Sequence, residues 1–261
     1  MTNTHKFCLV CNSPNLKPLE NYQKAHLVKC NNCGFVFCGP IPSLKELDDC
    51  YDRYERNDYL SKVTIKRYNE LLDRFEPYRK TNKLLDVGCG VGYFLEAAKK
   101  RGWEVYGTEY TDQAMDICNG KGIKMNKGKL DPSHYELGAF DIVTSFEVLE
   151  HINNPMEEVK NFYKTLRSGG LSYFTTPNLN AFERYSLKES YNIICYPEHL
   201  SYYTKSTMNR LLSDNGFEKK DLLTTGISLT RIKTSKKTSD EKIVQSNNSD
   251  DKVRNLTEDK L

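Results

Sequence analysis

Four of the nine cysteines form two C-x-x-C pairs near the beginning of the chain: Cys8, Cys11, Cys30 and Cys33. Four thiolates with this spacing and an intervening loop of this length can close a tetrahedron around zinc. Four protein ligands leave no open coordination position, so we expect the metal to stabilise a small fold and not to catalyse a reaction. Cys38 and His26 are the alternative ligands if one of the four is wrong.

A second group of residues with chemical potential follows the apolar run 83–87, with the sequence Asp86-Val87-Gly88-Cys89-Gly90-Val91-Gly92. Glycines in a loop between a strand and a helix let a ligand approach the backbone closely. Glu109 lies about twenty residues on, at the end of the next expected strand, where an acid binds ribose hydroxyls. A dinucleotide is the alternative ligand, but this loop is one residue too short for its G-x-G-x-x-G fingerprint.

Alternating strands and helices are expected to position these residues. The apolar patterns predict strands at 83–87, 103–108, 123–125, 140–146 and 171–175. They predict helices at 93–101 and 113–118, one that opens at 154 and ends at Gly169-Gly170, and one at 206–213. This order indicates an α/β fold with a doubly wound, Rossmann-like, mostly parallel sheet. Two further strands at 217–224 and 227–232 would bring the sheet to seven strands.

The chain is expected to contain four segments. A zinc-ribbon-like module without a core of its own occupies 1–42, and a helical connector occupies 43–82. The connector begins with Ser43 and Glu46 at capping-box spacing and contains an amphipathic helix at 61–76. The nucleotide-binding domain follows at 83–233. The segment 234–261 has no aromatic residue and many charges, which predicts a disordered tail.

The overall composition disfavours several classes of partner. The formal net charge is only +3 and 28% of the residues are charged, so no strong field of one sign favours nucleic acid. No apolar run is long enough to span a membrane, and the N-terminal residues lack the apolar core of a signal peptide. We therefore expect a cytoplasmic protein without a membrane partner.

Two separated motifs, 84–92 and 140–151, resemble those of the class I S-adenosylmethionine-dependent methyltransferases. The second motif ends in Leu149-Glu150-His151, as it often does in that family. The resemblance implies S-adenosylmethionine as the cofactor and a methyl transfer as the reaction. The residues that it implies in cofactor binding are Asp86, Gly88, Cys89, Gly90, Gly92, Glu109, Tyr110, Leu130 and Phe146. Among these, Glu109 would bind the ribose and Leu130 would lie near the adenine.

The segment 196–204 resembles the Glu-His-x-x-Tyr stretch of sugar C-methyltransferases, in which the Glu-His pair lies beside the substrate. Together with the N-terminal cysteines, this resemblance implies a small-molecule acceptor, such as a sugar or nucleotide-linked sugar of surface-glycan biosynthesis. The long further domain of the C-methyltransferases is missing here, which favours O-methylation. Transfer to a hydroxyl needs one base, and we expect His199, assisted by Glu198, to supply it. His151 or a tyrosine is the alternative base.

Two other functions stay open at this stage. The first is an RNA methyltransferase that uses the zinc module to bind RNA, although the segment 8–38 has no run of basic residues for phosphate contacts. The second is a protein that binds S-adenosylmethionine without turnover. Steeply salt-dependent RNA binding would favour the first, and binding without consumption of the cofactor would favour the second.

Overall fold

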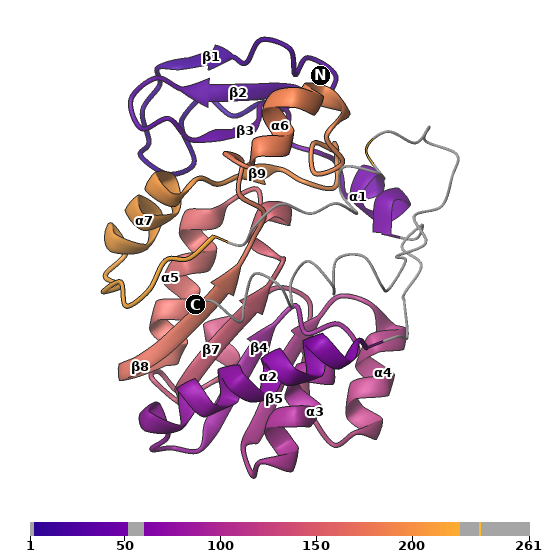
Figure 1. The fold of residues 1–261 in the computed structure, drawn as a ribbon, viewed down its shortest axis with the longest axis vertical. Coiled ribbons are helices and arrows are strands. Elements are labelled where there is room, and N and C mark those ends of the chain that lie inside the picture. Colours follow the sequence, from indigo (N-terminus) through magenta and orange to yellow (C-terminus); the bar gives the residue numbers. More distant parts are fainter. Residues whose placement is uncertain (1–2, 52–59, 225–234, 236–261) are drawn as a thin grey trace. The chain divides into compact units, whose positions relative to one another are not determined.

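The computed structural model describes residues 3–51, 60–224 and 235 of the chain (Figure 1). The contacts within the chain divide it into two compact units. The first unit comprises residues 1–57, 177–210 and 219–261, and the second comprises residues 58–176 and 211–218. Each unit has its own sheet and its own buried core. Apart from residue 235, the predicted tail at 234–261 lies outside the described residues.

The second unit is built on a parallel five-stranded sheet in the order β6-β5-β4-β7-β8. Its strands are β4 (Lys83–Val87), β5 (Glu104–Glu109), β6 (Lys124–Lys127), β7 (Phe140–Phe146) and β8 (Leu166–Thr175). Its helices are α2 (Lys62–Phe75), α3 (Tyr93–Lys100), α4 (Asp112–Gly120) and α5 (Pro155–Thr165), with short 3-10 turns η1 (Glu76–Tyr78), η2 (Pro132–His134) and η3 (Leu149–His151). In Figure 1, α2, α3 and α4 cover one face of the sheet and α5 lies on the other. The predicted doubly wound α/β fold is confirmed.

The order of the strands reverses between β4 and β7. From β4 the chain continues outward to β5 and β6, and it then crosses to β7 and β8 on the other side of β4. In open α/β sheets, ligands bind outside the carboxyl ends of the strands at such a reversal. The glycine loop directly follows β4, so the topology places it at this switch point.

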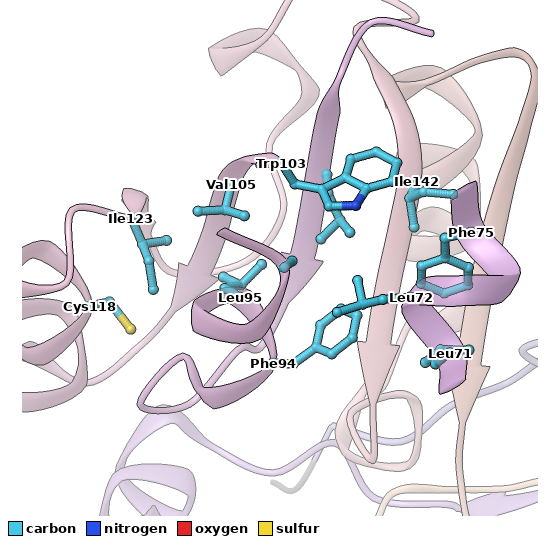
Figure 2. Packing of buried hydrophobic residues seen from close by; sticks show 12 residues of the cluster. Leu71, Leu72, Phe75, Phe94, Leu95, Trp103, Val105, Cys118, Ile123 and Ile142 are labelled. Atoms are coloured by element: carbon cyan, nitrogen blue, oxygen red, sulfur yellow. The ribbon is translucent and has the colours of Figure 1, made fainter. Parts of the chain in front are cut away.

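The core of the second unit lies under α2 and α3 against one face of the sheet (Figure 2). Leu71, Leu72 and Phe75 follow the apolar stripe of α2 and are buried there. The Trp103 ring is buried in the same cluster, and the Arg79 guanidinium lies over it at 4.6 Å. Burial of each large apolar side chain contributes about 1.5–3 kcal/mol, so α2 is an integral part of the fold.

A buried ion pair fixes the amino-terminal end of β7. The Asp141 carboxylate is fully buried and accepts hydrogen bonds from the Lys80 and Asn82 amides at 2.7 and 2.8 Å and from the Arg167 side chain. Burial acts to raise the pKa of Asp141, but the Arg167 charge and the backbone amides outweigh it and hold the pKa below its usual value. The pair ties the segment before β4 to β7 and β8.

The sheet differs from the prediction on its β8 side. Helix α5 ends at Thr165, and the glycine pair that was expected to end it lies inside β8 instead. Leu166 already pairs with Phe140 of β7, so strand pairing overrides the helix-stop pattern. The predicted strand at 217–224 is wrong, because the side chains of 218–221 are charged and exposed and offer no alternating apolar face. The strand at 227–232 lies outside the described residues, so the structure shows five parallel strands where seven were expected.

The first unit contains an antiparallel sheet in the order β1-β2-β3-β9. The strands are β1 (Leu16–Pro18), β2 (Leu27–Cys30), β3 (Val36–Cys38) and β9 (Ser201–Tyr202). The remaining elements are the helices α1 (Leu44–Tyr51) and α6 (Phe182–Leu187), the 3-10 turn η4 (Lys188–Ser190) and α7 (Lys205–Ser213), of which the last three residues belong to the second unit. The capping box of α1 is confirmed, since Ser43 Oγ accepts from the Glu46 amide and Glu46 Oε2 accepts from the Ser43 amide.

The composition predicted an N-terminal module without a core of its own. This prediction is wrong, because the segment contributes to a buried apolar cluster. Leu27 and Val36 are buried in one cluster with Leu179 and Tyr202. Residues 177–210, which the sequence placed in the domain at 83–233, join this unit because β9 pairs with β3. Among the described residues, no helix is both long and apolar enough to cross a membrane.

Candidate active site

The glycine loop leaves the carboxyl end of β4 and turns into α3. Gly88 has a φ of +71°, and a Cβ there would meet the Val148 side chain at 2.6 Å, so only glycine fits. Gly90 has a φ of +55°, and no atom lies within 4 Å of a Cβ built on it. Gly92 caps the start of α3. The loop therefore packs tightly at Gly88 and leaves open space over Gly90, where a ligand can approach the backbone.

Asp86 lies on β4 just before this loop and is only 2% exposed. Its Oδ1 accepts a hydrogen bond from Thr144 Oγ1 of β7 at 2.7 Å. Burial raises the pKa of Asp86 to about 7, while the Thr144 hydroxyl opposes this effect and the nearby Glu109 charge adds to it. Only one side-chain hydrogen bond, from Thr144, offsets the cost of burying this negative charge. The carboxylate is therefore suited to bind a cationic group.

Glu109 ends β5 beside the same loop. Its Oε2 accepts from the Gly90 amide at 2.9 Å, and its Oε1 accepts from the Tyr110 amide at 2.9 Å. Carboxylate oxygens in this position can also accept hydrogen bonds from the hydroxyls of a ribose. The structure thus brings together Asp86, the glycine loop and Glu109, as the sequence predicted.

The other residues that were predicted to bind the cofactor differ in their exposure and in the contacts of their side chains. The Tyr110 side chain is 61% exposed, whereas Leu130 is fully buried and its carbonyl accepts from Asn161 Nδ2 at 3.2 Å. Phe146 packs edge-on against Phe94 with ring centroids 5.0 Å apart. The Cys89 thiol is directed towards the sulfur of Met125, 4.0 Å away. Leu130 is thus covered by the protein, whereas Cys89 is partly exposed.

Two side chains beside Asp86 were not predicted from the sequence. Thr144 orients the carboxylate, and Tyr68 of α2 lies near enough for the Asp86 charge to act on it. Burial, followed by that charge, raises the pKa of Tyr68 to about 12, so the phenol is neutral. Its ring contacts Phe94 and Phe146 at centroid distances of 5.2 and 6.1 Å. Tyr68 falls within the amphipathic helix that was predicted at 61–76, and no spacing rule marks such a residue as facing a site.

His151, one of the predicted bases, lies in η3, close after β7. Its Nε2 is 4.0 Å from Oε1 of the neighbouring Glu150, which is buried and accepts from Thr176 Oγ1 at 3.0 Å. The histidine is therefore held at the carboxyl edge of the sheet, on the side of the switch point opposite to Glu109.

Glu198 and His199, the other predicted catalytic residues, belong to the first unit. The Glu198 carboxylate accepts from the Cys195 thiol at 3.4 Å. His199 Nδ1 is 2.8 Å from the Ile193 carbonyl oxygen. A carbonyl can only accept, so Nδ1 carries a proton, and Nε2 is the nitrogen through which a general base at this position would act.

The four cysteines of the C-x-x-C pairs converge in the first unit. Cys8 and Cys33 have their sulfur atoms 3.5 Å apart, Cys11 and Cys30 have theirs 3.6 Å apart, and all four sulfurs lie within 4.8 Å of one another. A tetrahedron with zinc–sulfur bonds of ~2.3 Å has edges of about 3.8 Å, so the spacing fits zinc. The residue after each pair, Asn12 or Gly34, has a positive φ, which turns the backbone around the sulfurs.

An open parallel sheet that carries a glycine loop and two acids at its switch point defines a nucleotide-binding α/β protein. A family model described as a methyltransferase domain matches residues 55–222, which is more than half of the chain. The chain belongs to this family of S-adenosylmethionine-dependent methyltransferases.

Among curated proteins, the chain is similar to enzymes named ubiquinone biosynthesis O-methyltransferase. The one from Idiomarina loihiensis is 34% identical over 105 residues, which cover 38% of this chain and 43% of that protein. The one from Pseudomonas entomophila is 30% identical over 140 residues, which cover 50% and 58% of the two chains. The chain thus spans about half the length of the curated relatives that it matches.

Solved structures of similar fold include the YcgJ protein from Bacillus subtilis, with a TM-score of 0.53 at 18% identity, over 73% of this chain and 88% of that one. A methyltransferase from Archaeoglobus fulgidus that depends on S-adenosylmethionine has a TM-score of 0.51 at 20% identity, over 74% and 89% of the two chains. At these identities the likeness shows the fold alone.

Proposed function

We propose that the protein transfers a methyl group from S-adenosylmethionine to a hydroxyl oxygen of a small organic molecule. The observation that carries the proposal is the convergence of Asp86, the glycine loop and Glu109 at the carboxyl edge of a parallel sheet. Two observations support oxygen as the target. The curated relatives bear the name of O-methyltransferases, and Nδ1 of His199 lies 2.8 Å from the Ile193 carbonyl oxygen, so a proton exchanged with an acceptor would pass through Nε2.

The residues at this edge fit S-adenosylmethionine. The open space over Gly90 admits the ligand next to the backbone, Asp86 offers its buried charge to a cation, and Glu109 offers two oxygens to hydroxyls. When bound, the cofactor supplies a methyl group on a positively charged sulfur. Asp86 and the loop would hold the cationic part, while Glu109 would hold the ribose. Tyr110, Leu130 and Phe146 are the further residues proposed to line this site.

In this proposal, the work of the protein is to align the acceptor and to take up its proton. His199 Nε2 removes the proton from the acceptor hydroxyl as the new carbon–oxygen bond forms, and the resulting imidazolium is held by its bond to the Ile193 carbonyl. Glu198 is the positioning residue in its segment. His151 is the alternative base.

Single-turnover kinetics of His199→Ala and His151→Ala will test the assignment. We expect His199→Ala to slow methyl transfer by about 10²–10⁴-fold, with the dissociation constant of S-adenosylhomocysteine within about twofold of the wild-type value. The His151→Ala variant serves as the matched control. A large loss in His151→Ala together with a normal rate in His199→Ala would transfer the role to His151.

The names of the curated relatives support a different acceptor class from the one that the sugar resemblance implies. Both curated enzymes are named for ubiquinone biosynthesis, so we propose a hydroxylated aromatic ring as the acceptor. Sugar and nucleotide-sugar hydroxyls, which the sequence predicted, form the second arm of an acceptor panel with radiolabelled S-adenosylmethionine. Transfer to sugars but not to phenols would restore the carbohydrate prediction. Transfer to RNA alone would overturn both.

For the cysteine cluster we propose a structural zinc ion. Elemental analysis of the purified protein should give one zinc per chain, and Cys11→Ser should reduce this content and lower the unfolding temperature. Cys50→Ser, a change outside the cluster, is the control and should keep the metal. A metal-free wild-type protein with unchanged stability would contradict the proposal.

A further inference from the structure

Glu158 is a buried carboxyl group that the proposed function has not used. It lies in the first turn of α5 and is only 5% exposed. In the described part of the chain, no hydrogen bond or close ion pair reaches its side-chain oxygens. Burial raises the pKa of Glu158 to about 7, against the opposing charge of Lys129. The raised pKa shows that the surrounding protein makes ionisation of this carboxyl group unfavourable, so a role is expected for it.

A structural role as a helix cap does not account for Glu158. An acid near the start of a helix interacts favourably with the helix dipole, but an exposed acid does so without the cost of burial. Glu157 already fills that role, since its Oε2 accepts from Asn154 Nδ2 at 2.8 Å and its Oε1 pairs with Lys129 at 3.3 Å. The start of α5 therefore does not need Glu158 for its stability.

The neighbours of Glu158 place it beside the ends of β5 and β6. Asn161, three residues on and so on the same side of α5, donates to the carbonyl of Leu130 in the segment that follows β6. Glu158 also acts on Tyr110, the residue that follows β5. Although much of Tyr110 is exposed, partial desolvation by the surrounding protein is the first cause that raises the pKa of its phenol, the Glu158 charge is the second, and Glu109 contributes less. The carboxyl group thus lies near enough to Tyr110 for its charge to act on the phenol.

If Glu109 binds a ribose, Glu158 is expected to lie near the base that this ribose carries. In a nucleoside the base is attached directly to the ribose, so a base held by Glu109 through its sugar would extend towards Tyr110, Leu130 and Glu158. The carboxyl group offers hydrogen-bond acceptors, and the Watson–Crick edge of adenine carries a donor in its 6-amino group. Hypoxanthine has a carbonyl oxygen at the same position and would not supply this donor.

We propose that Glu158 accepts a hydrogen bond from the 6-amino group of the cofactor's adenine and is the residue that selects this base. The proposal rests on the cofactor site described above. Binding would give the buried carboxyl group the partner that it lacks within the described chain. Tyr110 would cover the base on the solvent side.

A binding cycle between side chain and ligand will test this inference. Dissociation constants are measured by calorimetry for S-adenosylhomocysteine and for its analogue in which unsubstituted purine replaces adenine. The proteins are the wild type, Glu158→Leu, Glu158→Gln and the neighbouring control Glu157→Gln. We expect the wild type to prefer adenine by about 10–100-fold, the usual strength of a hydrogen bond to a charged group.

Glu158→Leu should bind both ligands within about twofold of each other, because the acceptor is gone. Glu158→Gln should keep part of the preference, since its amide oxygen still accepts, and Glu157→Gln should keep all of it. An unchanged preference in Glu158→Leu would overturn the proposal. If that variant binds neither ligand, Glu158→Met takes its place, because it retains the length of the side chain without an acceptor. A wild type that binds neither ligand would instead refute the cofactor site itself.

Discussion

Replacement of Asp86 by asparagine is expected to stabilise the protein in the absence of cofactor while destroying its affinity for the cofactor. The Asp86 carboxylate is 2% exposed and accepts its hydrogen bond from Thr144. An asparagine side chain has the same shape and keeps an oxygen for the Thr144 hydroxyl, but it carries no charge. The substitution therefore removes the cost of burying an ion and leaves the packing intact.

The size of this cost follows from the pKa of the carboxyl group. Its ordinary value is 3.8, and burial raises it to about 7. Each tenfold change in proton affinity corresponds to ~1.4 kcal/mol, so ionisation of the folded protein at pH 8 costs about 4 kcal/mol. The pKa of Asp86 is higher in the folded protein than in the unfolded chain. The folded protein is therefore about 4 kcal/mol more stable below pH 4 than at pH 8, and it loses this stability as the pH rises from 4 towards 7. The asparagine variant lacks this dependence.

Urea denaturation of the apoprotein between pH 5 and pH 8 measures the difference. We expect the free energies of unfolding of wild type and Asp86→Asn to diverge as the pH rises, with the variant ahead by several kcal/mol at pH 8. Thr144→Val is the control, because loss of the hydroxyl that favours the ionised form should steepen the pH dependence. If Asp86→Asn were no more stable than wild type at pH 8, the picture of an uncompensated buried charge would be refuted.

Three further outcomes are expected. The affinity of the wild type for S-adenosylmethionine should fall about tenfold for each pH unit below 7, because a proton then occupies Asp86; calorimetry at several pH values checks this. Asp141→Ala should lower the free energy of unfolding in urea by ~3–5 kcal/mol, because it leaves its arginine partner mostly buried and unpaired; a loss below 1 kcal/mol would show that the pair is dispensable. Gly88→Ala should cost about 2 kcal/mol of stability and weaken binding of S-adenosylhomocysteine, since its Cβ would overlap a valine side chain at a positive φ. Gly120→Ala, where a Cβ meets no atom within 4 Å, is the matched control and should be neutral or slightly stabilising.

The parts of this fold that were predicted from sequence are those determined by local patterns. The loop from Gly88 to Gly92 follows an apolar strand and opens a helix, and both neighbours lie within a few residues of it. The acid Glu109 could be placed because a strand of regular length leads to it. The glycine pair at 169–170 misled the prediction, because pairing of β8 with β7 decides that segment and this pairing is not visible in the local sequence.

The features that were missed depend on contacts between distant parts of the chain. Glu158 resembles any acid in the first turn of a helix, and only its burial distinguishes it from Glu157. Thr144 resembles any β-branched residue of a central strand until Asp86 is found beside it. Strand β9 has only two residues, too few for a periodic pattern, and it exists because β3 offers it an edge.

That pairing between β3 and β9 has a consequence for synthesis of the protein on the ribosome. The Cys38 thiol donates to the carbonyl of His199 across 161 residues of sequence. At about 5–20 residues per second, some 10–30 seconds pass between the emergence of the two strands. During that interval the edge of β3 has no partner, and unpaired edges invite association with other chains. The nascent N-terminal sheet is therefore a segment of this protein for which protection by a chaperone would matter.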